Sequence, residues 1–486
     1  MSEIVLQEAL KIQEGAGKAG VERQRRLNRM IARERIAYLL DDPKDFFEIG
    51  LWAAWKMYPE WGELPAAGVI VGIGKVSKRD VMIIANDATV KAGAFFPQST
   101  KKVLRAQKIA ENCRLPILYL VDSSGVFLPL QDEIFPDEDD FGRIFRNNAI
   151  LQEKKIPQIA AIMGNCIAGG SYLPALCDQL LMTEGSGLYL AGPALVKAAI
   201  GQVVDTEELG GAKMHATLSG TVDFLEKDDP ACLDKIKKLV SHLPKDPYPE
   251  LVDQKETPPF SVTKEYDARD LLKGILDDGS FDEFMKEYGK TLVTGYAKLG
   301  GQSIGVVANQ KIRQTSPKGE VQIGGVIYAD SAEKAARFVE ECDQMNLPIL
   351  FIQDVVGFMV GKEAEASGII RAGAKLVRAV STAKVPKITL VVGNSFGAGN
   401  YALCGKAYDP SFIFAWPEAK FAVMGAEQAS QVFASVKKGG NSEEVKKKYE
   451  EQTDIRYGAA RGWVDAIIDP KKTRQILMKA IRWVAR

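Results

Sequence analysis

Two glycine-rich turns have the residue types and spacing for chemistry. The first contains Ala168-Gly169-Gly170-Ser171, and the second contains Phe396-Gly397-Ala398-Gly399-Asn400. An apolar segment that begins with proline precedes each turn, and both the prolines and the turns are 229 residues apart. Because glycine and alanine leave the backbone uncovered, such a turn can offer N–H groups to a developing oxyanion. Two turns of this kind predict one reaction with two oxyanions.

Other uses of these turns are less well supported by the sequence. Glycines between a strand and a helix often only allow close packing, but two matched turns favour a function. Their spacing is not G-x-G-x-x-G, and no G-x-x-x-x-G-K-[ST] segment occurs, so redox and ATP chemistry are unsupported. The only histidines, His215 and His242, lie in no motif of a catalytic triad or a metal site. Enolate chemistry fits better, because one oxyanion donor contributes about 3–4 kcal/mol and the second reactant can supply the base.

The composition excludes several classes of protein. Lys+Arg and Asp+Glu are both 63 in the 486 residues, which argues against bulk nucleic-acid binding and against a membrane-surface protein. No apolar run reaches the ~18 residues of a membrane span, and the N-terminus does not resemble a signal peptide. The six cysteines are scattered and include no C-x-x-C pair, so we expect buried thiols in a cytoplasmic protein that holds no metal.

The chain contains two copies of one unit. Four blocks recur in the same order, the last of them being the turns. The first three pairs are 39–42 with 275–278, 81–86 with 304–309, and 115–125 with 347–357. Apolar, strand-like blocks alternate with amphipathic stretches at 98–112 and 331–345, which predicts an α/β fold with parallel sheets. Each segment before a turn is predicted to be a buried strand bounded by its proline and by Gly164 or Gly393.

Two further segments suggest the organisation of the chain. The proline-rich stretch 243–263 predicts a boundary, so the halves are about 1–250 and 260–486. The basic stretch from Arg23 to Arg35 has a helical pattern. It is either a solvated or inter-subunit helix face, or a contact for the phosphates of a ligand.

These residues resemble the carboxyltransferase subunits of biotin-dependent acyl-CoA carboxylases, over nearly the whole chain. The first half and the segments 397–401 and 425–429 are most similar to the beta subunit of methylcrotonyl-CoA carboxylase. The matching segments are 86–91, 95–97, 122–129, 131–137, 141–145, 168–172, 190–193, 397–401, 416–420 and 423–429.

The resemblance implies two tandem crotonase-like domains and a hexamer built as a trimer of dimers. Its active site would lie between the first domain of one subunit and the second domain of another. It implies that the N–H groups of Gly169 and Gly170 hold the acyl-CoA thioester oxygen. Those of Gly397 and Ala398 would hold the ureido oxygen of carboxybiotin, with Phe396, Gly399 and Asn400 around them. Further acyl-CoA contacts are implied at Ala85, Asn86, Lys91, Phe95, Phe96, Gly125, Ala168, Ser171 and Ala191.

The resemblance also implies that biotin is the cofactor and that it takes up the substrate proton, so no catalytic histidine is needed. The chain has no Met-Lys-Met biotinyl-lysine motif. It therefore depends on a biotin carboxylase and a biotin carrier, as separate proteins or as one fused subunit. Lys91 and the basic segment are candidates for the adenosine end of CoA.

Several alternatives stay open. Residues 310–320 resemble the alpha subunit of glutaconyl-CoA decarboxylase, and 331–338 with 368–376 resemble propionyl-CoA carboxylase. The resemblance favours carboxylation of 3-methylcrotonyl-CoA, while a sodium-pumping glutaconyl-CoA-type decarboxylase and a propionyl-CoA-type carboxylase subunit stay open. Phe95 and Phe96 either line an acyl pocket or belong to the core. A non-catalytic scaffold would have damaged turns, and a plain hydratase needs an acid/base carboxylate at a single oxyanion hole.

Overall fold

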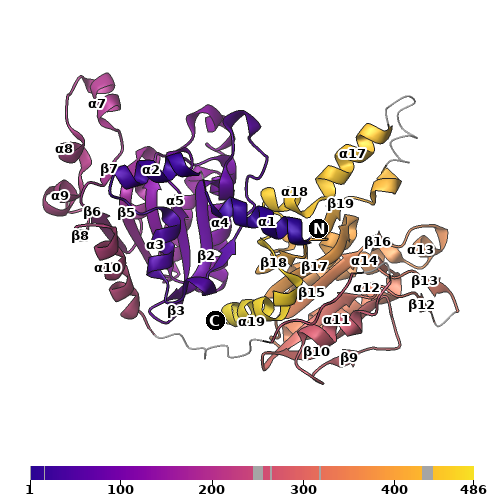
Figure 1. Cartoon of the computed structure of the whole chain (residues 1–486). Helices are drawn as coiled ribbons and strands as arrows, with labels where there is room; N and C mark the ends of the chain where they lie inside the picture. The colour runs from indigo at the N-terminus through magenta and orange to yellow at the C-terminus, as the bar shows by residue number, and fades with distance from the viewer. Residues whose placement is uncertain are drawn as a thin grey trace. The chain divides into compact units, whose positions relative to one another are not determined.

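A computed structural model describes residues 2–15, 17–244, 255–262, 265–316, 319–429 and 442–485 (Figure 1). The chain forms two compact units. The unit that we call the N-half is Leu6–Pro247 with Ala460–Gly462. The C-half is Tyr248–Ala459 with Met1–Val5 and Trp463–Arg486. Much of the predicted boundary segment, namely 245–254 and Thr263, lies outside the described residues, so the domain limits 1–250 and 260–486 stay a prediction.

The N-half contains a mixed sheet, whose described strands run in the order β1-β2-β3-β4-β5-β6-β8, with β7 beside the end of β5. The first three are antiparallel neighbours, and the others pair in parallel. The central strands are almost continuously apolar because both faces of the sheet are buried. The strands are β1 (Phe47–Ile49), β2 (Val69–Val76), β3 (Arg79–Asn86), β4 (Ile117–Ser123), β5 (Gln158–Ile167), β6 (Gln179–Thr183), β7 (Gly187–Tyr189) and β8 (Phe224–Glu226).

The C-half repeats this topology. Its large sheet has the order β9-β10-β11-β15-β17-β18-β20, with β19 beside the end of β17. Two short pairs lie outside it, β12 with β13 and β14 with β16. The strands are β9 (Asp282–Phe284), β10 (Leu292–Leu299), β11 (Gln302–Asn309), β12 (Gln314–Thr315), β13 (Val321–Gln322), β14 (Val326–Ile327), β15 (Ile349–Val355), β16 (Gly357–Phe358), β17 (Lys387–Phe396), β18 (Phe412–Ala415), β19 (Lys420–Ala422) and β20 (Ala466–Ile467).

Equivalent helices cover the two sheets. In the N-half, α3 (Ala32–Leu39) and α10 (Asp229–Ser241) share a core with the strands, while α4 (Pro97–Asn112) packs on β2 and β3 beside α5 (Phe141–Glu153). In the C-half, α12 (Ala329–Gln344) and α14 (Ile369–Thr382) share the main core. There, α11 (Ala268–Ile275) and α19 (Thr473–Val484) pack together against β10.

The predicted helices at 98–112 and 331–345 are confirmed as α4 and α12. A serine at the same place stabilises each N-terminus, because the Oγ atoms of Ser99 and Ser331 accept backbone N–H groups of Phe96 (2.9 Å) and Tyr328 (3.0 Å). One turn further along, each helix buries a lysine. Lys102 donates to the carbonyl of Ala66 (3.0 Å), and Lys334 donates to that of Tyr288 (2.9 Å).

The prediction of one helix from Arg23 to Arg35 is wrong. The helix α2 (Lys18–Arg26) ends within this segment, and α3 begins at Ala32. Between them, Asn28 has a left-handed backbone (φ 54°) that an α-helix cannot contain. Arg35 is neither solvated nor available to a ligand. It is 1% exposed, with its guanidinium 2.8 Å from the carboxylate of Asp229.

The strands before the turns also differ from the prediction, because neither stops at its glycine. β5 continues through Gly164, and β17 continues through Gly393. Both glycines are buried inside the strand, where the side chain of an aspartate occupies the space that a Cβ atom would need.

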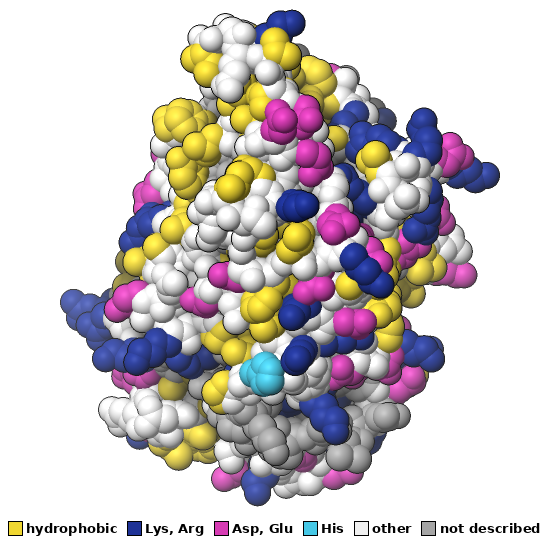
Figure 2. All heavy atoms as spheres, turned by 90° about the vertical axis from the view of Figure 1, so that its left-hand side faces the viewer, with side chains coloured by type: hydrophobic (Ala, Val, Ile, Leu, Met, Phe, Trp, Pro, Cys, Tyr) yellow, Lys and Arg dark blue, Asp and Glu magenta, His cyan; other side chains and the backbone are white. Residues whose placement is uncertain are grey.

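Several apolar side chains of the segment that contains α7, α8 and α9 are exposed. They are Leu190, Leu195, Ile200, Val203 and Leu218. On the face seen in Figure 2, acidic and basic side chains are interspersed, in agreement with the zero net charge. Other helices are α1 (Ser2–Gln13), α6 (Tyr172–Ala175), α7 (Pro193–Ile200), α8 (Thr206–Gly210), α9 (Ala212–Met214), α13 (Lys362–Ala366), α15 (Gly397–Ala402), α17 (Ser442–Thr453) and α18 (Ile455–Ala460).

Candidate active site

The first glycine turn follows directly from β5. Ile167 is extended (φ −122°), Ala168 is left-handed (φ 60°), and a 3-10 turn, Ala168–Ser171, leads into α6. Ala168 and Gly169 are exposed. Because the first N–H groups of a helical turn have no partners within that turn, this backbone can donate to a ligand.

Hydrogen bonds behind the turn hold its shape. The Oγ atom of Ser171 donates to the carbonyls of Cys166 (3.3 Å) and Tyr189 (3.1 Å), which ties the turn to β5 and β7. Gly125 approaches from the end of β4, where a Cβ atom would lie 3.1 Å from the carbonyl oxygen of Ile167. Burial raises the pKa of the Cys166 thiol to about 12, so this sulfur stays protonated and is not a nucleophile.

The open side of the first turn is apolar. Cβ atoms built on Gly169 or Gly170 would meet no atom nearer than the Phe141 ring, at 3.9 Å. These two glycines are therefore not required by packing within the chain. The ring of Phe141 lies 4.9 Å from that of Phe95, and Phe95 is 4% exposed. Phe141 is thus the aromatic side chain beside the two glycines.

The second turn is built in the same way at the end of β17. Phe396 is extended (φ −111°), Gly397 is left-handed (φ 52°), and α15 begins at Gly397. Gly397 occupies the position of Ala168, and the exposed Ala398 occupies that of Gly169. A Cβ atom at Gly397 would lie 2.9 Å from the carbonyl oxygen of Val423, so both packing and the left-handed backbone favour glycine here.

Side chains below the second turn hold it to the sheet. Asn400 donates from Nδ2 to the hydroxyl of Ser395 (2.7 Å), which in turn donates to Oε1 of Gln353 (2.5 Å). Gly399 packs against Val355, where a Cβ atom would lie 2.5 Å from a methyl carbon. These contacts of Asn400 and Gly399 are internal, and the cofactor role that the resemblance implies for them stays a prediction.

A buried aspartate lies beneath each turn. Asp122 Oδ1 accepts the N–H of Asn165 (3.1 Å), and its other oxygen is 3.5 Å from the guanidinium of Arg35. Burial raises the pKa of the Asp122 carboxyl, and the Arg35 charge opposes that rise. Asp354 Oδ1 accepts the N–H of Asn394 (2.9 Å) and an N–H of the Lys311 ammonium (3.1 Å).

Four other predicted site residues lie outside the turns. Ala85 and Asn86 are buried at the end of β3, Lys91 is exposed at the start of a 3-10 helix, and Ala191 is half-buried in a loop. Phe96 is fully buried and its ring stacks on that of Phe127 at 4.2 Å, which favours the core interpretation that the sequence left open.

The sequence analysis did not identify the two ion pairs below the turns, Asp122 with Arg35 and Asp354 with Lys311. A signal was present, because each aspartate ends an apolar strand at the same place in the two copies. A carboxylate at the end of a buried strand needs a cation nearby, but only the fold shows which one.

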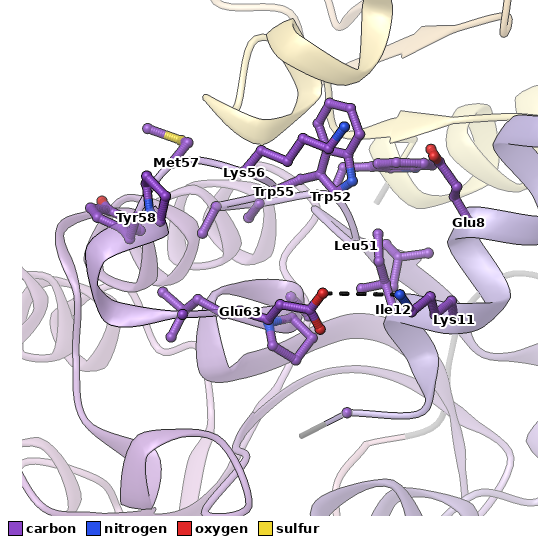
Figure 3. A pocket seen from close by; sticks show the side chains of 18 residues that line it. Glu8, Lys11, Ile12, Leu51, Trp52, Trp55, Lys56, Met57, Tyr58 and Glu63 are labelled. Atoms are coloured by element: carbon purple, nitrogen blue, oxygen red, sulfur yellow. Dashed lines mark ion pairs between the residues drawn. The ribbon is translucent and has the colours of Figure 1, made fainter. Parts of the chain in front are cut away.

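A cavity of about 550 Å³ lies apart from these residues, between α1 and the segment 51–66 (Figure 3). Trp52, Trp55 and Tyr58 line it, and the ammonium of Lys56 lies 4.3 Å from the centre of the Trp55 ring. The ion pair between Lys11 and Glu63 (3.9 Å) is drawn as a dashed line. None of the predicted site residues lines this cavity.

Among the described residues, no three His, Cys, Asp or Glu side chains are grouped as the ligands of a metal ion would be. No helix in this part of the chain is both long and apolar enough to cross a bilayer.

Comparison with known proteins identifies the family. The carboxyl transferase domain model matches residues 23–486. This chain belongs to the carboxyl transferase family. It is 42% identical to the mitochondrial methylcrotonoyl-CoA carboxylase beta chain of Arabidopsis thaliana, over 96% of this chain and 83% of that protein. Identity is also 42% to the biotin-dependent 3-methylcrotonyl-coenzyme A carboxylase beta1 subunit of Mycobacterium tuberculosis, over 96% and 91% of the two chains.

A solved structure agrees with this assignment. The beta subunit of geranyl-CoA carboxylase from P. aeruginosa superposes with a TM-score of 0.87 at 33% identity, over 99% of this chain and 91% of that chain. The predicted α/β fold with two tandem crotonase-like domains is confirmed. The chain is therefore the carboxyltransferase subunit of a biotin-dependent acyl-CoA carboxylase, a family in which another subunit carries the biotin.

Proposed function

We propose that this carboxyltransferase moves CO2 from carboxybiotin to 3-methylcrotonyl-CoA, through an enolate held by two backbone oxyanion holes. The observation behind the mechanism is the pair of turns. Each has a left-handed first residue, Ala168 or Gly397, followed by an exposed small residue, Gly169 or Ala398, at a helical N-terminus. The choice of acyl group rests on the relatives at 42% identity, which are methylcrotonyl-CoA carboxylase subunits.

The two turns have separate roles in this proposal. The N–H groups of Gly169 and Gly170 stabilise the thioester oxygen as it becomes an enolate oxygen, with Phe141 and Phe95 on the apolar side. The N–H groups of Gly397 and Ala398 hold the ureido oxygen. Bound carboxybiotin supplies the CO2 and the nitrogen that accepts the substrate proton. The backbone donors fit both oxygens, because no side chain of the turn covers them.

This role requires partners. A biotin carboxylase and a biotin carrier deliver the carboxyl group. The exposed apolar side chains between Leu190 and Leu218 support a homo-oligomer, proposed as a hexamer in which the first turn of one copy meets the second turn of another. The cytoplasmic location stays a prediction, since some relatives are mitochondrial.

A decarboxylase is the second candidate. The methylmalonyl-CoA decarboxylase subunit alpha of Veillonella parvula is 33% identical over 99% of this chain and 95% of that protein. A glutaconyl-CoA-type decarboxylase would use the same two turns in the opposite direction.

A carboxylation assay tests the proposal. The subunit, with its biotin carboxylase and carrier, receives ATP, labelled bicarbonate and one of four acceptors: 3-methylcrotonyl-, propionyl-, crotonyl- or acetyl-CoA. Label on 3-methylcrotonyl-CoA supports the proposal. Label mainly on propionyl-CoA would mean that propionyl-CoA, and not 3-methylcrotonyl-CoA, is the substrate. No label on any acceptor, but CO2 release from glutaconyl-CoA with free biotin, would favour the decarboxylase.

A further inference from the structure

The strand before each turn contains the same irregularity. In the N-half, Val121 pairs with Ile162, but Ser123 pairs with Cys166, so β5 contains two more residues than β4 over this interval. In the C-half, the pairing of β15 with β17 passes from Gln353–Val391 to Val355–Ser395, again with two extra residues. The turn begins two residues after the irregularity in both halves.

The partner strand changes at the same place. β5 pairs with β6 through Ile162 and with β7 from Asn165 onward. β17 pairs with β18 through Val391 and with β19 from Asn394 onward. Residues 163–164 of β5 and 392–393 of β17 therefore have no ladder partner on either side. Other groups must fix the conformation of their backbone.

In both halves one carboxylate occupies this gap. Asp122 accepts the N–H of Asn165 and fills the space beside Gly164, where a Cβ atom would lie 2.0 Å from its Cγ. Asp354 accepts the N–H of Asn394 and fills the space beside Gly393, with the corresponding distance 2.5 Å. No residue larger than glycine fits against either carboxylate.

A cation from a distant part of each half completes the arrangement. Arg35, from α3, lies against Asp122 and also donates to the carbonyl of Met163 (2.8 Å), inside the irregular stretch. Lys311 pairs with Asp354, which also accepts the hydroxyl of Tyr266 (3.2 Å).

We infer that Asp122 and Asp354 are positioning residues, each of which sets the direction of the backbone N–H groups in one turn. This inference rests on the proposed function of the turns. The two aspartates are 4% and 2% exposed, below turns whose Ala168 and Ala398 face outward, so neither is placed to exchange a proton with a reactant. Their effect is on geometry, where a displacement of 1 Å costs about a hundredfold in rate.

Two isosteric variants, Asp122→Asn and Asp354→Asn, test the inference in the full chain with its partner proteins. Asparagine keeps an oxygen for the backbone N–H but loses the charge that holds the cation. Because the turns hold different reactants, we expect Asp122→Asn to lower kcat/KM for acyl-CoA and Asp354→Asn to lower kcat/KM for free biotin. The expected loss is about tenfold to a hundredfold, with the other substrate affected much less.

Asp465→Asn is the matched control. Asp465 is also buried, pairs with Lys406 (2.7 Å) and accepts a backbone N–H, that of Ile413 (2.9 Å), but it lies beside β18 and not at the irregular stretch of β17. We expect it to lower Tm without changing kcat/KM for either substrate. Equal losses for all three variants, or equal losses for both substrates, would overturn the inference.

A double variant separates positioning from stability. Asp354→Asn leaves the buried Lys311 ammonium without its carboxylate, and adding Lys311→Met removes that lone charge, which should restore Tm. If Asp354 positions the turn, activity stays low in the double variant. If the carboxylate only stabilises the fold, activity recovers together with Tm, and the inference is wrong.

Hydrogen–deuterium exchange gives a measurement that needs no substrate. Asp354→Asn should accelerate amide exchange in a peptide covering 393–400 but not in one covering 164–171, and Asp122→Asn should do the reverse. Unchanged exchange in both peptides would contradict the positioning role. A wild-type protein that carboxylates none of the acyl-CoA acceptors would instead refute the proposed function, and exchange would still report on the aspartates.

Discussion

The two halves share a backbone design but differ in how each turn is anchored. Both have the strand order, the two-residue irregularity, the buried aspartate and the left-handed residue at equivalent positions. In the N-half, Ser171 holds the turn through backbone carbonyls, and the glycines face open space. In the C-half, Asn400 and Gly399 connect the turn to side chains of the sheet.

The comparison separates features that shape the turn from features that depend on the ligand it would hold. The common features shape the backbone, so they belong to the turn itself. The features that differ are the groups beside the open side of each turn and the contacts that hold the turn to the sheet. Phe141 borders the first turn, whereas the backbone of Val423 borders the second. In the proposed function, one duplicated unit presents the same backbone donors to two chemically different oxygens.

Gly397→Val should have the largest effect and should test whether the second turn is essential. We expect loss of carboxyl transfer with an intact hexamer, because the bulk of valine would cover the biotin oxygen site. The structure adds a conformational cost of about 1–3 kcal/mol, since a side chain at φ 52° is strained. We expect no transfer and a lower Tm, with the hexamer retained in gel filtration. Normal turnover would refute the assignment.

Gly169→Val should act on chemistry with little effect on folding. The position has open space for a side chain, but the methyl groups would cover the N–H groups that face the ligand. Loss of one oxyanion donor corresponds to a fall of about 10²–10³ in kcat. Gly142→Val, on the exposed surface of α5 with no neighbour within 4 Å, is the control for adding a valine. A similar kcat for both variants would exclude the first turn from catalysis.

The reciprocal exchange Gly397→Ala and Ala168→Gly should give a smaller, asymmetric effect. Alanine at 397 has both a left-handed backbone and a Cβ atom 2.9 Å from the carbonyl of Val423, so we expect a loss of about 1–2 kcal/mol in unfolding free energy. Ala168 already has this conformation, and glycine there should be nearly neutral. Equal Tm values for the two variants would mean that alanine is no more strained at position 397 than at position 168.

The buried lysines should be visible in the pH dependence of stability. Burial lowers the pKa of Lys102 to about 7 and that of Lys334 to about 8. Above these values the native lysine is neutral while the unfolded one is still protonated, so stability rises with pH toward 10. Below them both states are protonated and the dependence disappears. The measurement is Tm from pH 6 to 10. Lys102→Met should remove a rise in Tm that begins near pH 7, and Lys334→Met should remove a rise in Tm that begins near pH 8. Curves parallel to the wild type would contradict both lowered pKa values.

The sequence alone was sufficient for the α/β fold, the duplication and the family, because periodic apolar segments and matched motifs are local patterns. It located both turns, but their roles as oxyanion holes stay a prediction. It was wrong about Arg35, whose basic neighbours suggested a helix face for solvent or phosphates. Arg35 is buried against Asp229, 194 residues further along the chain.

What this sequence determined by itself is therefore the order of elements and the positions of two glycine turns. Only the tertiary structure revealed that Gly164 and Gly393 lie inside strands, each against the carboxylate of an aspartate from the neighbouring strand. It also revealed which cation accompanies each aspartate. The physical reason is that a buried charge has no local pattern: its partner is decided by which distant segment the folded core brings within a few ångströms.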